Sequence, residues 1–181
     1  MDLMEKRLKS ELIYDGAILS VRRDLVELPN GKTAYREVVD KMGAVCVVPL
    51  FDDGRVGVVN QFRYPYMAEI LELPAGKLDG DEDPLTGAVR ELSEETGLTA
   101  ERWDYLGTMY PSVGFTNEIL YLYLARGLKS GEQHLDKDEF LNYETMPLEE
   151  LVDLVMGNKL PDAKSAIAVL KTKLFLEREV R

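Results

Sequence analysis

The chain has few of the residues on which most redox and zinc sites depend: it contains one cysteine and one histidine among 181 residues. Its lone cysteine, Cys46, excludes an intrachain disulfide, and the apolar run from Ala44 to Leu50 around it predicts a buried thiol. The lone histidine, His134, stands in a polar stretch, which predicts a surface residue and excludes multi-histidine metal sites. We therefore expect a reducing, cytoplasmic setting.

Long apolar runs and basic charge are also scarce. No stretch approaches the roughly eighteen apolar residues of a membrane span, and the first twelve residues have no long apolar core, so a soluble protein is expected. Lysine and arginine number 22 against 33 acidic residues, for a formal net charge of −11. This balance disfavours nucleic-acid binding, which usually needs a basic face. It is compatible with a small phosphorylated substrate, because metal ions can reverse the local potential of a site.

Acidic residues are concentrated in residues 76–98, GKLDGDEDPLTGAVRELSEETGL. Glu91, Glu94 and Glu95 follow the spacing i, i+3 and i+4, which places three carboxylates on one face of a helix. Because like charges repel, a cation is expected to compensate them, and Arg90 can neutralise only one. Hard carboxylate oxygens favour magnesium, manganese or calcium over zinc for the remaining charge.

Signals at both ends of this stretch also predict a helix. Asp83 suits the N-cap and Pro84 the first helical position, while Gly97 suits the residue just past the end. The alternative to a metal site is a solvated, charged helix face, which acid pairs on helices usually form.

The stretch resembles the Nudix box, GX5EX7REUXEEXGU with U aliphatic, at every fixed position. The matching residues are Gly76, Glu82, Arg90, Glu91, Leu92, Glu94, Glu95, Gly97 and Leu98. The resemblance implies a magnesium-dependent hydrolase of a diphosphate bond, with manganese as the other candidate metal. A motif of this kind is a hypothesis until its loop and helix context is seen.

The resemblance also implies roles within the site. Its metal ligands are Glu91, Glu94, Glu95 and the backbone carbonyl of Ala75, with Glu82 behind them or acting through water. Arg90 is implied to hold a box glutamate through a bidentate ion pair, which its planar fork suits. Gly76 and Gly97 are expected at tight bends of the backbone.

Residues before the box resemble the ADP-ribose pyrophosphatase branch of the family, also called ADP-sugar diphosphatases. Gln61–Pro65 followed by Glu72–Gly76 is similar to the segment that leads into the box in that branch. The similarity implies that Arg63 contacts the diphosphate and that Glu72 helps to fix the substrate. A surface salt bridge is the alternative for Arg63.

Residues after the box are similar to the same branch. Residues 111–118, PSVGFTNE, resemble its SPGF-type loop, with Val113 where proline is more usual. The similarity implies that Gly114, Phe115 and Glu118 contact the substrate, with Glu118 opening a strand. An ordinary strand connection is the alternative for this loop.

Two glutamates are candidates for the base that activates the hydrolytic water. In the similar enzymes the base is often a glutamate on a mobile loop late in the chain, which implies Glu139 in the run Asp136–Glu139. The alternative base is Glu94 of the box. The alternative interpretation of residues 136–139 is a solvated acidic loop without a catalytic role.

The order of elements predicts an α/β (α+β) fold. Alternation from Ile13 to Val39 around Asn30-Gly31 predicts two or three antiparallel strands. Further predicted strands cover 44–51, 55–64, 69–73, 103–110, 118–124 and 140–146, and helices follow Pro147 and Pro161. The Nudix resemblance implies an α/β/α sandwich with a mixed sheet over residues 42–181, preceded by a small antiparallel β appendage over residues 1–41.

The resemblance further implies a partner and a substrate. In similar enzymes the appendage exchanges with a second subunit, which implies a homodimer, and Tyr35 is a candidate to stack on the nucleotide base. Packing across neighbouring strands is the alternative for Tyr35. The leading hypothesis is metal-dependent hydrolysis of ADP-ribose, and of other nucleoside diphosphate sugars, to AMP and a sugar phosphate.

Three alternatives stay open. The substrate could be another nucleoside diphosphate derivative, such as GDP-mannose, a dinucleoside polyphosphate, FAD or NADH, since one box binds the diphosphate and metals that all of these share. An oxidised nucleoside triphosphate is a further candidate. The third alternative is a non-catalytic nucleotide-sugar sensor, which the intact acids and the lack of a basic stripe disfavour.

Overall fold

The computed structural model describes residues 2–179, which form two compact units. The first unit contains the residues up to Gly43 together with Tyr110–Ile119. The second contains Ala44–Met109 and the residues from Leu120 onward. The sequence did not predict that the loop at 110–119 belongs with the N-terminal residues.

An antiparallel sheet forms most of the first unit. Its strands, in the order β1-β2-β3, are β1 (Lys6–Asp15), β2 (Ser20–Glu27) and β3 (Thr33–Asp40). The predicted hairpin at Asn30-Gly31 is present: Gly31 has a φ of 78°, and the Leu28 N–H donates to the Lys32 carbonyl at 2.7 Å. A positive φ is easily adopted only by glycine, so this residue allows the chain to reverse.

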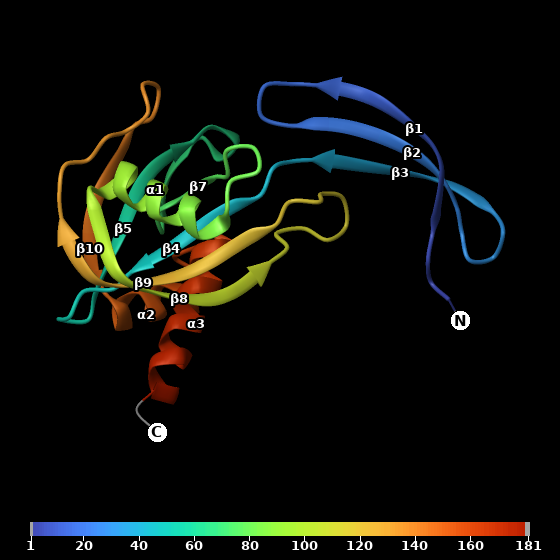
Figure 1. Cartoon of the computed structure of the whole chain (residues 1–181). Helices are drawn as coiled ribbons and strands as arrows, with labels where there is room; N and C mark the ends of the chain where they lie inside the picture. The colour runs from blue at the N-terminus through green and yellow to red at the C-terminus, as the bar shows by residue number, and fades with distance from the viewer. Residues whose placement is uncertain (1, 180–181) are drawn as a thin grey trace. The chain divides into compact units, whose positions relative to one another are not determined.

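Two sheets form the framework of the second unit (Figure 1). The four-stranded sheet has the order β7 (Ala75–Lys77), β4 (Ala44–Pro49), β9 (Leu120–Ser130), β8 (Leu98–Met109), and the three-stranded sheet has the order β10 (Leu141–Pro147), β5 (Arg55–Arg63), β6 (Ala68–Glu72). The β4–β9 pair is parallel and the other pairs are antiparallel, so the sheet that contains β4 is mixed.

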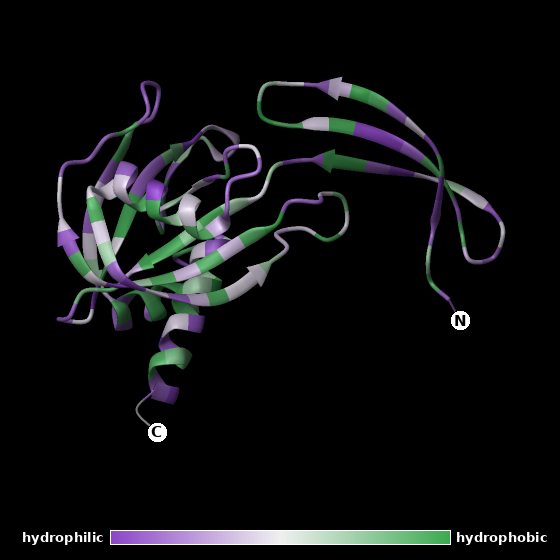
Figure 2. Cartoon of the chain, in the orientation of Figure 1, coloured by the Kyte–Doolittle hydropathy of each residue, from purple (hydrophilic) through white to green (hydrophobic). Residues whose placement is uncertain are grey.

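Helices cover both faces of the four-stranded sheet (Figure 1). They are α1 (Pro84–Thr96), α2 (Leu148–Met156) and α3 (Ala163–Glu179), and a short 3-10 helix, η1, spans Tyr64–Tyr66. All six residues of β4 are buried, and the strand is apolar along its length in Figure 2. Val45 and Val47 pack in the α1 cluster, whereas Cys46 and Val48 pack in the α2–α3 cluster. Because side chains alternate along a strand, β4 serves two cores at once. The predicted sandwich is confirmed.

Cys46 is fully buried at the centre of β4, as predicted. Burial raises the pKa of its thiol far above the ordinary value, so the reactive thiolate does not form near neutral pH. The cytoplasmic setting stays a prediction. No helix among residues 2–179 has both the length and the apolar character that crossing a membrane requires.

Candidate active site

The box helix α1 begins and ends where the sequence predicts. Asp83 is the N-cap, and its Oδ2 accepts hydrogen bonds from the N–H groups of Leu85 at 3.0 Å and Thr86 at 3.2 Å. Gly97 adopts a left-handed φ of 69° and donates its N–H to the Ser93 carbonyl. The local signals at both ends are therefore confirmed, and they place Glu94 and Glu95 in the last turn.

Arg90 binds three of the box glutamates. Its Nε and Nη2 donate to the two oxygens of Glu82 at 3.1 and 2.9 Å, which forms a bidentate pair. Its Nη1 donates to Glu91 at 2.8 Å and to Glu94 at 2.9 Å, and Nη2 also reaches the Lys77 carbonyl at 2.9 Å. One cation thus faces three anions, so this part of the site carries excess negative charge.

Glu91 is almost entirely buried, with 8 % of its surface exposed. Burial raises the pKa of its carboxyl to about 7, against the lowering effect of Arg90. The carboxylate lies against Gly76, where an added Cβ would be 2.0 Å from Glu91 Cδ. Gly76 itself is in β7, paired with Val45 of β4. The prediction of a tight bend at Gly76 was wrong: the glycine is required there for close approach and not for turning.

Glu95 is the most buried box acid, with 2 % of its surface exposed. Its Oε2 accepts a hydrogen bond from the N–H of Ala75 at 3.0 Å, which joins α1 to the start of β7. Burial is the main cause that raises the pKa of Glu95 to about 8, and the negative charge of Glu139 adds to it. Burial therefore favours the neutral, protonated form of Glu95 near neutral pH, and the charged form would require a nearby cation.

The segment that carries Glu139 runs along the end of α1. Three hydrogen bonds attach it to the last turn: Gly131 N–H to Gly97 O at 2.7 Å, Gln133 Nε2 to Glu95 O at 2.5 Å, and His134 N–H to Glu94 O at 3.0 Å. These bonds satisfy carbonyls that a helix end leaves without partners. The negative charge of Glu139 also contributes to the raised pKa of Glu91, so the two groups influence each other electrostatically.

Arg63 and Glu72 form a bidentate ion pair, with both N–H···O distances at 2.6 Å. Glu72 is 3 % exposed and also accepts a hydrogen bond from Lys164 of α3. Burial raises the pKa of Glu72, but the two cations together outweigh it and hold the pKa below its usual value. Sequence reasoning missed Lys164 and its partner Asp162. Asp162 could have been found as an N-cap after Pro161, whereas no local pattern points to Lys164.

The other predicted substrate contacts belong to the first unit, and their placement beside the box stays a prediction. Tyr35 is exposed, with the Arg23 guanidinium 5.2 Å from its ring centroid. Glu118 forms an ion pair with Lys41 at 2.6 Å and precedes β9, which begins only at Leu120.

Two more of these predicted contacts lie in the loop at 110–119. Phe115 is exposed and its carbonyl accepts the N–H of Val39 at 2.7 Å. An added Cβ at Gly114 would have open space around it.

Within residues 2–179 no three side chains of His, Cys, Asp or Glu are arranged closely enough to hold a metal ion. Three of the box glutamates, Glu82, Glu91 and Glu94, are instead paired with Arg90. The residues nevertheless suit a hard divalent cation. Their donors are carboxylate oxygens, and burial raises the pKa of Glu91 and of Glu95, an effect that a cation bound to them would oppose.

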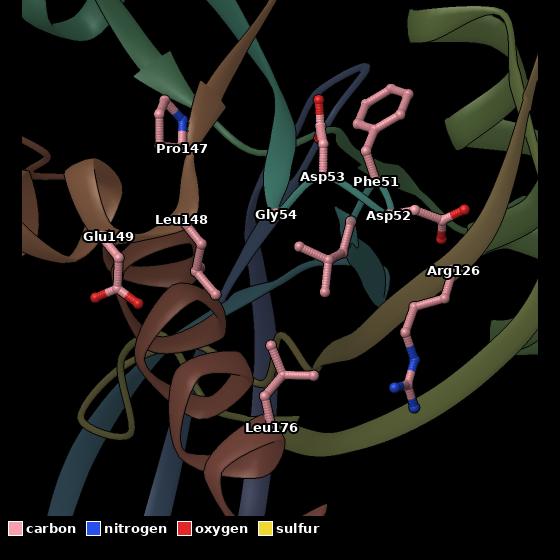
Figure 3. A pocket seen from close by; sticks show the side chains of 10 residues that line it. Phe51, Asp52, Asp53, Gly54, Arg126, Pro147, Leu148, Glu149 and Leu176 are labelled. Carbon is pink, nitrogen blue, oxygen red and sulfur yellow. The ribbon is translucent and has the colours of Figure 1, made fainter. Parts of the chain in front are cut away.

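A separate cavity of about 520 Å³ is formed by the β4–β5 turn, the start of α2 and the end of α3 (Figure 3). Leu50, Leu148 and Leu176 form apolar parts of its lining. Its Arg126 is already paired with Asp104 and Glu179. None of the predicted site residues lines this cavity, so it is not the candidate active site.

Family models match two parts of the chain. The model of the NUDIX domain matches residues 40–170. The model of the nucleoside diphosphate sugar hydrolase N-terminal domain matches residues 5–39. Together the two matches account for most of the chain.

Relatives and a solved structure agree with these models. The chain is 41 % identical to a methanol dehydrogenase activator of Bacillus methanolicus, over 91 % of this chain and 90 % of the relative. It is also 41 % identical to an ADP-ribose pyrophosphatase of Bacillus subtilis, over 92 % and 91 % of the two chains. A crystal structure of an ADP compounds hydrolase superimposes with a TM-score of 0.88 at 21 % identity, covering 99 % of this chain and 98 % of the other, which shows the shared fold.

Proposed function

Because the chain belongs to the Nudix family of hydrolases, we propose that it hydrolyses the diphosphate bond of ADP-ribose to AMP and ribose 5-phosphate with the help of magnesium. Nudix hydrolases generally use divalent metals and act on small nucleotide substrates. Other nucleoside diphosphate sugars are included in the proposal, because they share the bond that is cut.

One observation carries the proposal: Glu91 and Glu95 are buried carboxylates, held beside Gly76 and Ala75, whose pKa values are raised to about 7 and about 8. Keeping acids in such surroundings costs stability, since burial disfavours the charged form. Strongly perturbed acids of this kind are typical of functional sites. A divalent cation held by these residues would offset the cost.

The residues divide into those that hold a metal and those that hold the substrate. Glu91, Glu94, Glu95 and the Ala75 carbonyl would hold the cation. Glu82 keeps Arg90 in place through its bidentate pair, and Arg90 in turn orients Glu91 and Glu94. When bound, the cation would neutralise charge on the phosphate oxygens and lower the pKa of a water molecule.

Arg63 is assigned to the substrate's diphosphate. Its guanidinium is fixed by Glu72, and 38 % of the side chain is still exposed. An arginine with a planar fork and a partly open face suits phosphate oxygens.

Glu139 is the proposed base. Its charge acts on both Glu91 and Glu95, and its segment is attached to the end of α1. Glu139 takes the proton of the attacking water as the new P–O bond forms and the P–O bond of the leaving phosphate breaks. Glu94 is the alternative base, although one of its oxygens already accepts a hydrogen bond from Arg90 at 2.9 Å.

A second candidate function is activation of a dehydrogenase. The relative from Bacillus methanolicus that carries this description matches nine tenths of both chains, at the same identity as the pyrophosphatase from Bacillus subtilis. The two functions are separable, because hydrolysis of a free nucleotide needs no partner protein.

The test is a product analysis with magnesium across ADP-ribose, GDP-mannose, diadenosine polyphosphates, NADH, FAD and 8-oxo-dGTP. We expect ADP-ribose to be the preferred substrate, because the pyrophosphatase relative spans nearly the whole chain. Glu139→Gln is expected to lower kcat by about a hundredfold or more, as loss of a general base does. Glu94→Gln serves as the comparison that decides between the two bases.

Other outcomes of this panel would contradict the proposal. Preference for another substrate would overturn the assignment of ADP-ribose. If the wild type hydrolysed none of the compounds but raised the activity of a methanol dehydrogenase, the second candidate would replace the first. Binding of ADP-ribose without turnover or activation would favour a sensor.

We also propose that a second copy of the chain covers β1. All ten residues of this strand are exposed, and they include Leu8, Leu12, Ile13 and Tyr14. Exposed apolar side chains on a strand at the edge of a sheet are a surface for association. The match to the N-terminal domain of nucleoside diphosphate sugar hydrolases covers the same residues.

Sedimentation analysis tests this assembly. The wild type is expected to sediment as a dimer, whereas the double variant Leu8→Lys, Leu12→Lys is expected to sediment as a monomer because charges in an apolar interface lose their hydration. Thr33→Lys, at an exposed polar position of the same sheet, is the matched control. A dimer that survives the double variant would show that β1 is not the interface.

A further inference from the structure

Lys164 is a largely buried lysine outside the box to which the proposed reaction assigns no role. It lies in the first turn of α3, and 13 % of its side chain is exposed. Its Nζ donates to Glu72 Oε2 and to Asp162 Oδ2, the latter at 2.9 Å. A lysine that gives up its hydration for two carboxylates requires a reason, because burial alone disfavours the ammonium.

Lys164 completes a charge-balanced group of four side chains. Arg63 and Lys164 supply two positive charges, and Glu72 and Asp162 supply two negative charges. Glu72 is the shared member, since Arg63 takes both of its oxygens and Lys164 takes one of them again. Without Lys164 the group would keep one uncompensated negative charge, next to the arginine that is to receive an anion.

The first turn of α3 also holds the backbone that leads into the box. Asp162 caps the helix by accepting the N–H of Ser165 at 3.0 Å. The buried Ser165 hydroxyl then accepts the N–H of Leu73 at 2.7 Å. Two residues further on, Ala75 is bound to Glu95. The Glu72–Ala75 segment is therefore fixed by α3 at one end and by α1 at the other.

Arg63 gains its orientation from this group. Its Nε and Nη2 donate hydrogen bonds to Glu72, and Nη1 has no hydrogen-bond partner among the described residues. A guanidinium fixed on one edge and open on another is prepared for a phosphate. If Glu72 had Arg63 as its sole cation, the buried carboxylate would draw the guanidinium more strongly toward itself.

We propose that Lys164 is a positioning residue: by sharing the Glu72 carboxylate with Arg63, it balances the charge of the group and sets the free edge of Arg63 for the diphosphate. The assignment rests on the proposed function in one respect, namely that Arg63 contacts the diphosphate. The orientation of Arg63 by Lys164 can be tested without any substrate.

The kinetic test compares Lys164→Met with the wild type on ADP-ribose. KM is expected to rise about tenfold while kcat changes little, since the lost interaction serves binding in the ground state and the transition state alike. Lys164→Arg keeps the charge and is expected to restore most of the affinity. Lys173→Met is the matched control, because Lys173 lies on the same helix and pairs with Glu149.

A double-mutant cycle with Arg63→Gln separates positioning from a general loss of structure. If Lys164 acts through Arg63, the double variant is expected to have the KM of Arg63→Gln alone. Independent, additive increases in KM would overturn the proposal. Should Lys164→Met fail to fold, the cycle is run in the background of Asp162→Asn, which removes the excess charge while asparagine keeps the N-cap.

The substrate-free test follows the Nε–Hε signal of Arg63 by NMR, assigned by its absence in Arg63→Gln. A changed shift and faster hydrogen exchange in Lys164→Met, with no change in Lys173→Met, would support the proposal. An unchanged Arg63 signal would overturn it. If the wild type did not hydrolyse ADP-ribose, the proposed function would fail, and this signal would still decide the role of Lys164.

Discussion

Glu95→Gln is expected to abolish hydrolysis and, at the same time, to stabilise the metal-free protein. The activity is expected to fall by more than about a hundredfold. Loss of a residue that only supports a metal ligand typically lowers activity by about 10–100-fold, and loss of a ligand itself is expected to cost more. The stability of the metal-free form is expected to rise because the substituted glutamine has no charge to bury. Its amide oxygen can still accept the Ala75 N–H that Glu95 accepts now.

The direction of the stability change follows from the pKa of Glu95. The pKa is raised from 4.5 to about 8 in the folded state, so between these values the folded protein holds a proton that the unfolded chain has lost. Unfolding then releases a proton, and the free energy of unfolding falls as the pH rises through this window. Near neutral pH the variant is expected to gain about 3 kcal/mol over the wild type.

Chemical denaturation with a chelator present, at about pH 5 and about pH 8, measures this difference. The gain is expected to be larger at the higher pH. Glu101→Gln is the control, since this glutamate is exposed and paired with Lys129. Added magnesium is expected to raise the melting temperature of the wild type and to leave that of Glu95→Gln nearly unchanged. A variant less stable than the wild type at both pH values would show that Glu95 is a structural residue.

Gly76→Ala is the second change with a large expected effect. An added Cβ would be 2.0 Å from the Glu91 carboxylate, far inside van der Waals contact. Either β7 moves away from α1 or Glu91 leaves its place, and both outcomes disturb the acids. We expect a loss of about 1–3 kcal/mol in the free energy of unfolding, as overpacking usually causes, together with loss of activity.

A double-mutant cycle with Glu91→Ala tests the cause. Once the Glu91 carboxylate is removed, Gly76→Ala is expected to cost little stability, because its Cβ no longer meets that side chain. If Gly76→Ala lowered the free energy of unfolding by as much in the Glu91→Ala background, the backbone conformation at Gly76, and not the contact with Glu91, would require a glycine there. Gly114→Ala is a control for stability only, since a Cβ there has open space.

The box helix and the buried strand β4 were predicted correctly from nearby residues. The box helix runs from Pro84 to Thr96 because Asp83 caps its first turn and Gly97 ends its last one. β4 was recognisable as a strand buried on both faces from its uninterrupted apolar run. Interactions over a few residues decide these features, so a sequence displays them directly.

Predictions that depended on distant residues were less complete. The neighbouring strands β4 and β5 belong to different sheets, although the Asp52-Asp53-Gly54 turn connects them. Sequence spacing cannot distinguish a hairpin from a crossing between sheets, because the choice depends on which partners β4 finds later in the chain. Its neighbours proved to be β7 and β9.

The sequence by itself determined the family of this protein and the placement of its box glutamates, because they belong to one continuous motif and their spacing along a helix places them on one face. Tertiary structure decided how those groups are charged and held. Burial of Glu91 against Gly76, the Glu95 bond to Ala75 and the Lys164 contact with Glu72 each join residues that are far apart in the chain. Desolvation and charge balance are properties of a packed interior, and they arise only when separate segments meet.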